Sequence, residues 1–249
     1  MTWGSFGVVH LASLALAAAA LIGLYFVLKR CSRKTQTLVL GVLSFSGIAA
    51  IIFNLVTWNS PLEYLPLHLC SLNALVLPIA VFTRSKTLGN LLLVWSLGAL
   101  AALVVNTAQA DFVLFSDVFC FYFFPHVLEF GIPILLFALG LVKKDIKCIG
   151  STLGITLVSY TAIHLINLAI NHMCQVNEIL DYAGNVIQVN YMYSLVPENP
   201  LLQLFYNLIP FEYWYMYMIF PIVAVYLLLV YAGQLKEKIQ NRKCAAAVK

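Results

Sequence analysis

The chain has 249 residues, of which 62% are hydrophobic and only 10% are charged, and its formal net charge is +4. This is too little charge to cover the surface of a soluble protein of this size. The composition therefore excludes an ordinary soluble domain. The basic residues lie at the ends of apolar runs and not in one patch among aromatic residues, which argues against nucleic-acid binding.

Seven apolar runs are long enough to cross a bilayer, for which about 20 residues are needed. We expect the first run to be a retained span, because no basic segment precedes it. The sequence therefore predicts an all-α fold, a single domain over residues 1–249 with seven transmembrane helices. The expected spans are about 6–28, 37–57, 65–82, 87–106, 116–142, 149–172 and 208–232.

The basic residues predict how this bundle is oriented. With seven spans, all Lys and Arg residues fall on one side of the membrane, and most acidic residues fall on the other. Lys and Arg are disfavoured in short exported loops. We therefore expect the N-terminus outside and the C-terminus in the cytoplasm. This orientation brings Cys120 and Cys174 near the same face, so a disulfide between them is one expectation to test.

The longest expected loop, 173–207, is then extracytoplasmic. Turn-forming residues at 181–185 precede an apolar and aromatic stretch at 186–196. This pattern is typical of a small hairpin or of a lid on the membrane surface. The alternative is an interfacial belt of tyrosines that anchors the last helix.

Polar and ionisable residues gather in the extracytoplasmic half of the expected spans, where they are costly to bury. Cys70 and Asn73, like His126 and Glu129, are spaced i and i+3, and therefore share a helix face. The full set is His68, Cys70 and Asn73 in the third span, Asn106 at the end of the fourth, His126 and Glu129 in the fifth, and His164, Asn167 and Asn171 in the sixth.

Three chemistries fit this set. A cysteine with a histidine base forms a nucleophilic thiolate, so Cys70 pairs with His126 or His164, with an Asn as oxyanion donor. Alternatively, the histidines, Cys70 and Glu129 are enough ligands for zinc, although no metal-site spacing is present. A transport relay is the third option, without an inverted repeat to support it. Simple hydrogen bonding between helices is the structural alternative.

Short motifs in order along the chain resemble the YwaF family of bacterial integral membrane proteins. They are Leu67-His68-Leu69-Cys70 with Pro78, Asn90-Leu91-Leu92, the Phe-rich approach to His126, and Asn190-Tyr191-Met192-Tyr193 before Pro197. That family is in turn similar to a eukaryotic transmembrane acyltransferase, which moves an acyl chain from a diacyl phospholipid to a lyso-ether lipid through a cysteine.

The resemblance implies matching roles for a few residues. The catalytic cysteine matches Cys70, a His-Val with a later Pro matches His126-Val127 and Pro133, and a second membrane histidine matches His164. One departure is that the eukaryotic motif has a histidine directly after the cysteine, where this chain has Ser71.

Together, residues and resemblance predict a membrane lipid acyltransferase or lipid thioesterase that works from the outer leaflet through a Cys70 thioester. Asn73 or Asn167 would support the site and Glu129 would orient the base; the other candidate substrate-binding or orienting residues are His68, Asn106, Asn171, Asn190 and Tyr193. We expect no cofactor and no metal, membrane phospholipids as partners, and a bacterial plasma membrane as location. The alternative is a protein that binds or transports a small solute or metal.

Overall fold

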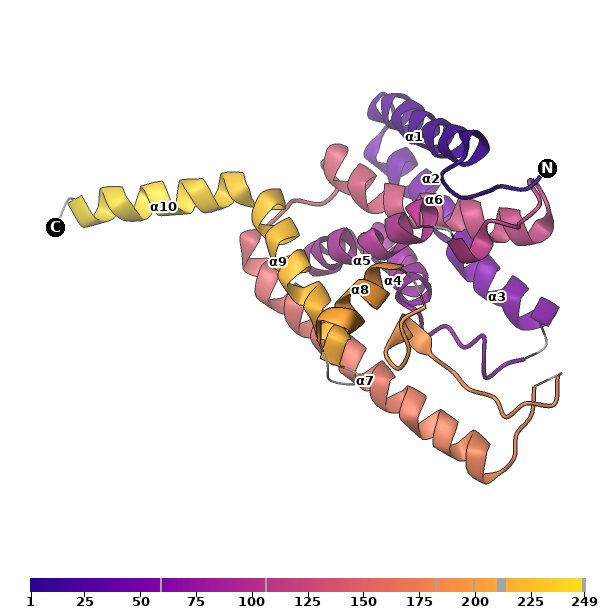
Figure 1. The fold of residues 1–249 in the computed structure, drawn as a ribbon. Coiled ribbons are helices and arrows are strands. Elements are labelled where there is room, and N and C mark those ends of the chain that lie inside the picture. Colours follow the sequence, from indigo (N-terminus) through magenta and orange to yellow (C-terminus); the bar gives the residue numbers. More distant parts are fainter. Residues whose placement is uncertain (59, 106, 182, 199, 210–213, 248–249) are drawn as a thin grey trace.

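The computed structural model describes residues 1–58, 60–105, 107–181, 183–198, 200–209 and 214–247 (Figure 1). Within these ranges the chain is helical, and its only β pairing is two isolated bridges, Thr2–Val113 and Leu180–Val186. The α-helices are α1 (Val8–Lys29), α2 (Arg33–Ser44), α3 (Ser46–Trp58), α4 (Leu69–Thr83), α5 (Lys86–Val104), α6 (Asp117–Ala138), α7 (Ile149–Val176), α8 (Pro200–Leu208), α9 (Ile219–Val230) and α10 (Ala232–Ala247). Short 3-10 helices are η1 (Thr107–Gln109), η2 (Ile146–Cys148), η3 (Tyr191–Tyr193) and η4 (Trp214–Met218).

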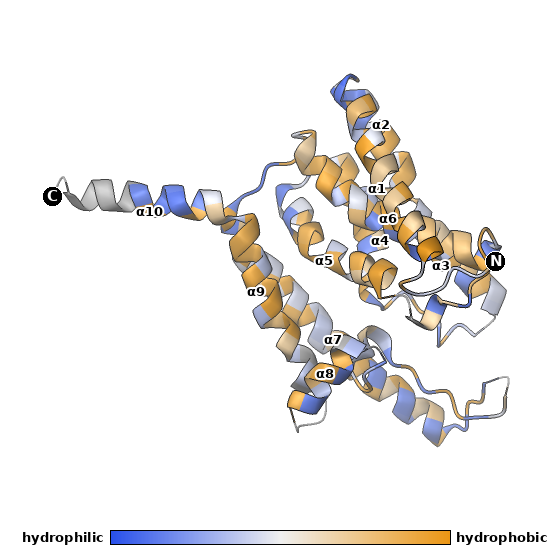
Figure 2. Ribbon diagram, turned by 45° about the horizontal axis from the view of Figure 1, so that its top comes forward, coloured by the Kyte–Doolittle hydropathy of each residue, from blue (hydrophilic) through white to orange (hydrophobic). Residues whose placement is uncertain are grey.

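Five helical segments are long and apolar enough to cross a membrane: α1, α2 with α3, α5, α6, and Ile146–Val176. A sixth is α9 together with the start of α10, which bends away by 66°. Figure 2 shows apolar residues along α9 and hydrophilic residues along α10, which projects away from the other helices. By length and composition the described chain has five or six candidate spanning helices, which does not confirm the seven expected.

The difference lies mainly in the run expected at 65–82. Only α4, with 15 residues, forms there, and it begins at Leu69. Pro61 and Pro66 explain the late start, because a proline disfavours the helical conformation of the residue before it. The helix expected at 208–232 also starts late: α8 ends at Leu208, and α9 begins only at Ile219.

The core that positions the site lies between α2, α4, α5 and α6. Its fully buried side chains are Leu40, Leu77, Leu92, Ile132 and Leu136. Burial of these side chains is the main contribution to packing within this part of the bundle. In contrast, α1 lies at the edge of the bundle with 6% of its span buried, and it contacts this core through Leu21, Leu24 and Leu28.

The basic turns between helices gather at one end of the bundle. Arg33 donates to the carbonyl oxygen of Gly140 at 2.7 Å, and Arg84 donates to the carbonyl oxygen of Arg33 at 3.3 Å. Lys86 forms an ion pair with Asp145 at 2.5 Å. The turns after α1, α4 and α6 therefore lie side by side.

The segment 186–196 packs along α7 instead of extending into solvent. The side-chain amide of Asn171 donates to the carbonyl oxygen of Val189 and accepts from its N–H group. Asn167 makes the same pair of hydrogen bonds with Tyr191. The expected hairpin is present as the Leu180–Val186 bridge. Tyr191 and Tyr215 are buried, so these two rings are not part of an interfacial belt.

The disulfide expectation is wrong. Cys120 and Cys174 are both free thiols, and Cys174 is fully buried at the far end of α7.

Candidate functional site

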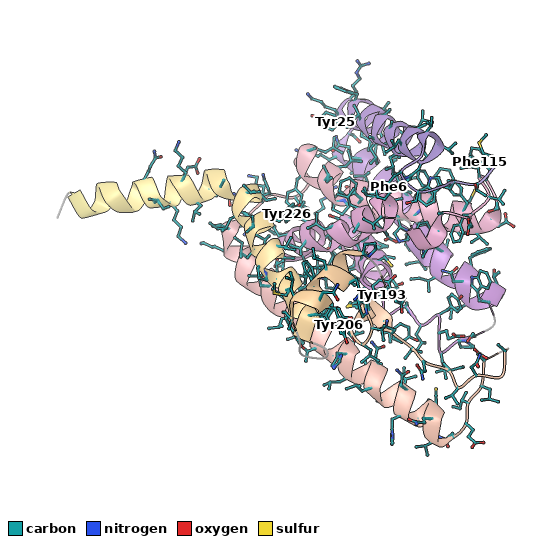
Figure 3. The ribbon with its side chains drawn as sticks, viewed as in Figure 1. Phe6, Tyr25, Phe115, Tyr193, Tyr206 and Tyr226 are labelled. Atoms are coloured by element: carbon teal, nitrogen blue, oxygen red, sulfur yellow. The ribbon has the colours of Figure 1, made fainter. Side chains whose placement is uncertain are left out.

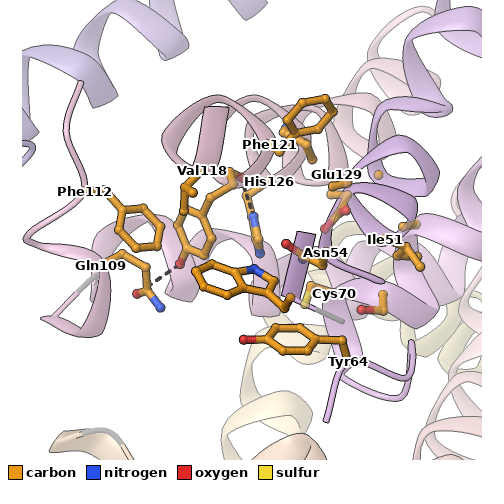
Figure 4. Close-up of a pocket in the computed structure, with 17 residues that line it drawn as sticks. Ile51, Asn54, Tyr64, Cys70, Gln109, Phe112, Val118, Phe121, His126 and Glu129 are labelled. Carbon is orange, nitrogen blue, oxygen red and sulfur yellow. Dashed lines mark hydrogen bonds between the residues drawn. The ribbon is translucent and has the colours of Figure 1, made fainter. Parts of the chain in front are cut away.

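A pocket of about 280 Å³ lies between α3, α4, α6 and the loop around 109–112 (Figure 4). It contains a thiol, an imidazole and a carboxyl group, which come from two facing helices. The lining residues are Gly47, Ala50, Ile51, Asn54, Trp58, Tyr64, Cys70, Ser71, Ala74, Gln109, Phe112, Val118, Phe121, Tyr122, Pro125, His126 and Glu129. The pocket is thus the place where the chain brings its expected nucleophile and base together.

Cys70 is the second residue of α4, and His68 is the N-cap of that helix. No side chain among the described residues caps the first N–H groups of α4. The N–H groups of Cys70 and Ser71 and the Ser71 hydroxyl donate toward the Cys70 sulfur. Burial of the sulfur and the neighbouring Glu129 carboxyl outweigh these donors and favour the neutral thiol, so a base is needed to remove its proton.

His126 presents a defined tautomer to the pocket. Its Nδ1 lies 2.6 Å from the carbonyl oxygen of Tyr122, one turn earlier on α6. A carbonyl oxygen can only accept, so Nδ1 carries the proton and Nε2 keeps a lone pair. The geometry therefore equips His126 to take a proton at Nε2.

A proline on α6 ties the two helices together. Pro133 has no backbone N–H, so the carbonyl oxygen of Glu129, four residues earlier, lacks its helical donor. The Asn73 side-chain amide of α4 donates to this oxygen at 3.2 Å. Because Asn73 lies one turn after Cys70, this bond fixes Cys70 relative to Glu129.

His68, His164, Asn167 and Asn171 lie outside the pocket, against the segment 186–196. His164 Nδ1 contacts the Ser194 hydroxyl at 3.1 Å, and Asn167 donates to the same oxygen at 2.9 Å. His68 Nδ1 accepts from the N–H of Met192 at 3.3 Å. The expected layer thus divides in two, with Cys70, His126 and Glu129 in the pocket and His164 in the other group.

Two further residues belong to the loop group, and one cannot be placed. The Asn190 amide donates to Glu198 at 2.6 Å and closes the turn that follows it. The Tyr193 ring lies 5.5 Å from the His68 ring, at the inner end of the segment (Figure 3). Burial, and then negative charge on Cys70, raise the pKa of Tyr193 to about 12, so its hydroxyl stays protonated. Asn106 lies outside the described residues.

Sequence reasoning missed several polar residues of the pocket. Asn54 interrupts the apolar run of α3, a signal that was present in the sequence. Tyr122 precedes His126 by one helical turn, and its hydroxyl donates to the Ala102 carbonyl oxygen at 2.8 Å. Tyr64 comes from the turn before α4; burial and the Glu63 carboxylate raise its pKa. No spacing rule links Tyr64 to this pocket.

The zinc-ligand set considered from the sequence is not assembled. Within the described part of the chain, no three His, Cys, Asp or Glu side chains lie close enough together to hold a metal ion. His68 and His164 bond to the 186–196 segment instead of pointing into the pocket.

The apolar helices and the pocket built between them define a multi-pass α-helical membrane protein. The chain belongs to the TMEM164 family, whose model matches residues 5–231. This match supports a TMEM164-like membrane family and does not confirm the YwaF name that the short motifs suggested. No curated protein and no solved structure matches the chain.

Proposed function

We propose that this protein transfers or hydrolyses the acyl chains of membrane lipids through a thioester on Cys70. One observation carries the proposal: Cys70 stands at the uncapped start of α4, in the same pocket as the free lone pair of His126. A nucleophile, a base and a preorganised anion-stabilising site are the parts that acyl transfer needs.

The chemistry follows from these positions. His126 Nε2 takes the proton of the Cys70 thiol, and the thiolate attacks the carbonyl carbon of a phospholipid ester. The Asn54 side-chain amide, on the pocket wall, is a donor for the oxyanion. The tetrahedral intermediate collapses, the alkoxide of the lysolipid leaves with the proton from His126, and the acyl group stays on sulfur.

The transmembrane arrangement that we propose has seven crossings, with α4 as the short third one. The gathering of the basic turns at one end of the bundle supports it, because in this arrangement Arg33, Arg84 and Lys86 would all lie on the cytoplasmic side. The pocket lies near the start of α4, at the opposite end, and would open toward the outer leaflet. A bacterial plasma membrane is proposed from the YwaF resemblance alone.

Transfer between lipids in reconstituted vesicles tests the proposal. Purified protein receives a diacyl phospholipid with a labelled acyl chain and a lysophospholipid, and labelled products are measured. We expect Cys70→Ala to abolish transfer and Cys31→Ala to preserve it, since Cys31 lies at the turn after α1 and lines no part of the pocket. Equal activity of wild type and Cys70→Ala would contradict the proposal and favour the solute-binding alternative.

A further inference from the structure

The pocket contains a carboxyl group that the first half of this mechanism does not use. Glu129 is 3% exposed and lines the pocket together with Cys70 and His126. Its Oε2 has no hydrogen-bond partner among the described residues of the protein. A buried carboxyl oxygen without a donor is unfavourable, so a ligand that brings a donor to it gains affinity.

The carboxyl group is held in this position from two sides. A methyl group built on Gly47 of α3 would lie 2.6 Å from Glu129 Oε1 and 2.5 Å from the Ala74 side chain, so only glycine leaves space for the carboxyl. On the other side, Asn73 holds the backbone of Glu129. Oε2 is therefore presented to the pocket by fixed neighbours and not by a free side chain.

The charge of the pocket restricts what enters it. None of the residues that line it is Lys or Arg, and Glu129 is the one acidic residue among them. A lipid phosphate would be desolvated there without a cation, which is strongly unfavourable. A head-group ammonium would bring its attached phosphate along. A neutral hydroxyl is the donor that reaches Oε2 without this cost.

We propose that Glu129 binds the free hydroxyl of the acyl acceptor and so directs the acyl group of Cys70 to an alcohol. This inference rests on the proposed function and specifies its second half. The pocket volume of about 280 Å³ is at the lower limit for a drug-sized ligand, so it admits the glycerol region while the acyl chains and phosphate stay outside.

The step balances in atoms and charge. Glu129 acts as a neutral carboxyl group, as burial without a cation requires. The acceptor hydroxyl gives its proton to Glu129 Oε2 while its oxygen attacks the thioester carbonyl carbon, and the carboxyl passes its own proton to the Cys70 sulfur. The new C–O bond forms, the C–S bond breaks, and Cys70 leaves as the thiol, which restores the starting enzyme without any further reactant.

Separate measurement of acylation and discharge tests the inference. Wild type, Glu129→Gln and Glu129→Asp are loaded from diacyl phospholipid, and the acyl mass on the intact protein is followed after lysophospholipid is added. We expect Glu129→Gln to become acylated but to discharge at least about tenfold more slowly, with Glu129→Asp in between. Asp117→Asn, an exposed carboxyl on the same helix, is the matched control and should discharge like wild type.

Each other outcome has a definite meaning. Discharge of Glu129→Gln at the wild-type rate, or failure of only this variant to acquire the acyl group, overturns the role of Glu129. Slow discharge restricted to acceptors with an ethanolamine head group, and absent with a glycerol head group, would mean that Glu129 binds an ammonium, and also overturns it. A wild-type protein that never acquires an acyl group rejects the proposed function itself.

Discussion

Single residues in this protein compensate for one another at the point where the site is built. Pro133 removes a helical hydrogen bond, and Asn73 replaces it from the neighbouring helix. Inside a membrane such a replacement is needed, because no water is present to satisfy the freed carbonyl oxygen. Asn73 is therefore a positioning residue, because its amide nitrogen donates to the Glu129 carbonyl oxygen and not to a group in the pocket.

His126 is the residue for which the proposed mechanism makes the clearest kinetic prediction. Because its Nδ1–H donates to the Tyr122 carbonyl oxygen, Nε2 is the nitrogen that can act as the base. We therefore expect His126→Ala to slow acylation of Cys70 by about 10²- to 10⁴-fold. Single-turnover acylation by labelled phospholipid measures this. His164→Ala is the control, because His164 contacts Ser194 outside the pocket. If His164→Ala slowed acylation more than His126→Ala did, His164 and not His126 would be the base.

At the scale of elements, the segment 186–196 is attached to α7 by a few amide side chains. Two consecutive residues in it, Met192 and Tyr193, have φ values of 53° and 54°, a left-handed conformation that is costly without glycine. Hydrogen bonds hold them there, since the Tyr160 hydroxyl donates to the Met192 carbonyl oxygen at 2.8 Å and Tyr215 donates to that of Tyr193.

Asn167→Ala should release this segment. The substitution removes the paired bonds to Tyr191 and leaves buried backbone groups without partners, at a cost of about 1–3 kcal/mol. We expect faster amide hydrogen exchange over 186–196 with unchanged exchange in α4 and α5. Asn177→Ala is the control, because its amide donates to the Met173 carbonyl oxygen at the exposed end of α7. Equal protection in both variants would show that the apolar contacts of the segment suffice.

The hairpin at 180–186 should respond to acid. The Asp181 carboxylate accepts from the N–H groups of Asn185 and Ala183 at 2.8 Å, and these bonds hold its pKa below the ordinary value of 3.8. A carboxyl with a lowered folded-state pKa stabilises the fold at neutral pH, and this stabilisation is lost as pH falls below 3.8.

Hydrogen exchange of the Asn185 amide, corrected for intrinsic rates, measures this loss. Protection should fall at low pH in wild type, and in Asp181→Asn it should be reduced and independent of pH. The Val189 amide is an internal control, because its partner Asn171 does not titrate. An Asn185 amide that keeps full protection well below pH 3.8 would contradict the assignment.

At the scale of the whole molecule, the sequence predicts the all-α membrane fold, but it predicts only some of the helix boundaries. Long apolar runs predict α1, α5, α6 and α7 because length and composition alone decide whether a helix crosses a bilayer. The start of α4 depended on two prolines in a run that still reads as apolar. The bend of 66° after α9 has no equally simple signal.

The site shows the same division. The i and i+3 spacing placed Cys70 with Asn73 and His126 with Glu129, and both pairs contribute to one helix contact. The loop that binds His68 and His164 could not be placed, because spacing within a helix carries no information about which distant segment lies against it. The sequence therefore predicted one layer of polar residues where the structure has two separate groups.

The seven-crossing arrangement makes a prediction about accessibility. Single cysteines introduced in a cysteine-free background at the turns near 31, 85 and 145 should react with a membrane-impermeant thiol reagent only from the cytoplasmic side. Cysteines near 111 and 180 should react only from outside, and α10 should be cytoplasmic. The turn at 85 is decisive, since its labelling from the outside would show that α4 does not cross.

The acyl-enzyme tests the central claim most directly. Purified protein incubated with diacyl phospholipid and quenched in acid should gain the mass of one acyl chain, localised by peptide mass spectrometry to Cys70. Neutral hydroxylamine should remove it, as expected for a thioester. If Cys70 remains unmodified, or if the acyl mass appears equally in Cys70→Ala, the assignment of Cys70 as the nucleophile is wrong.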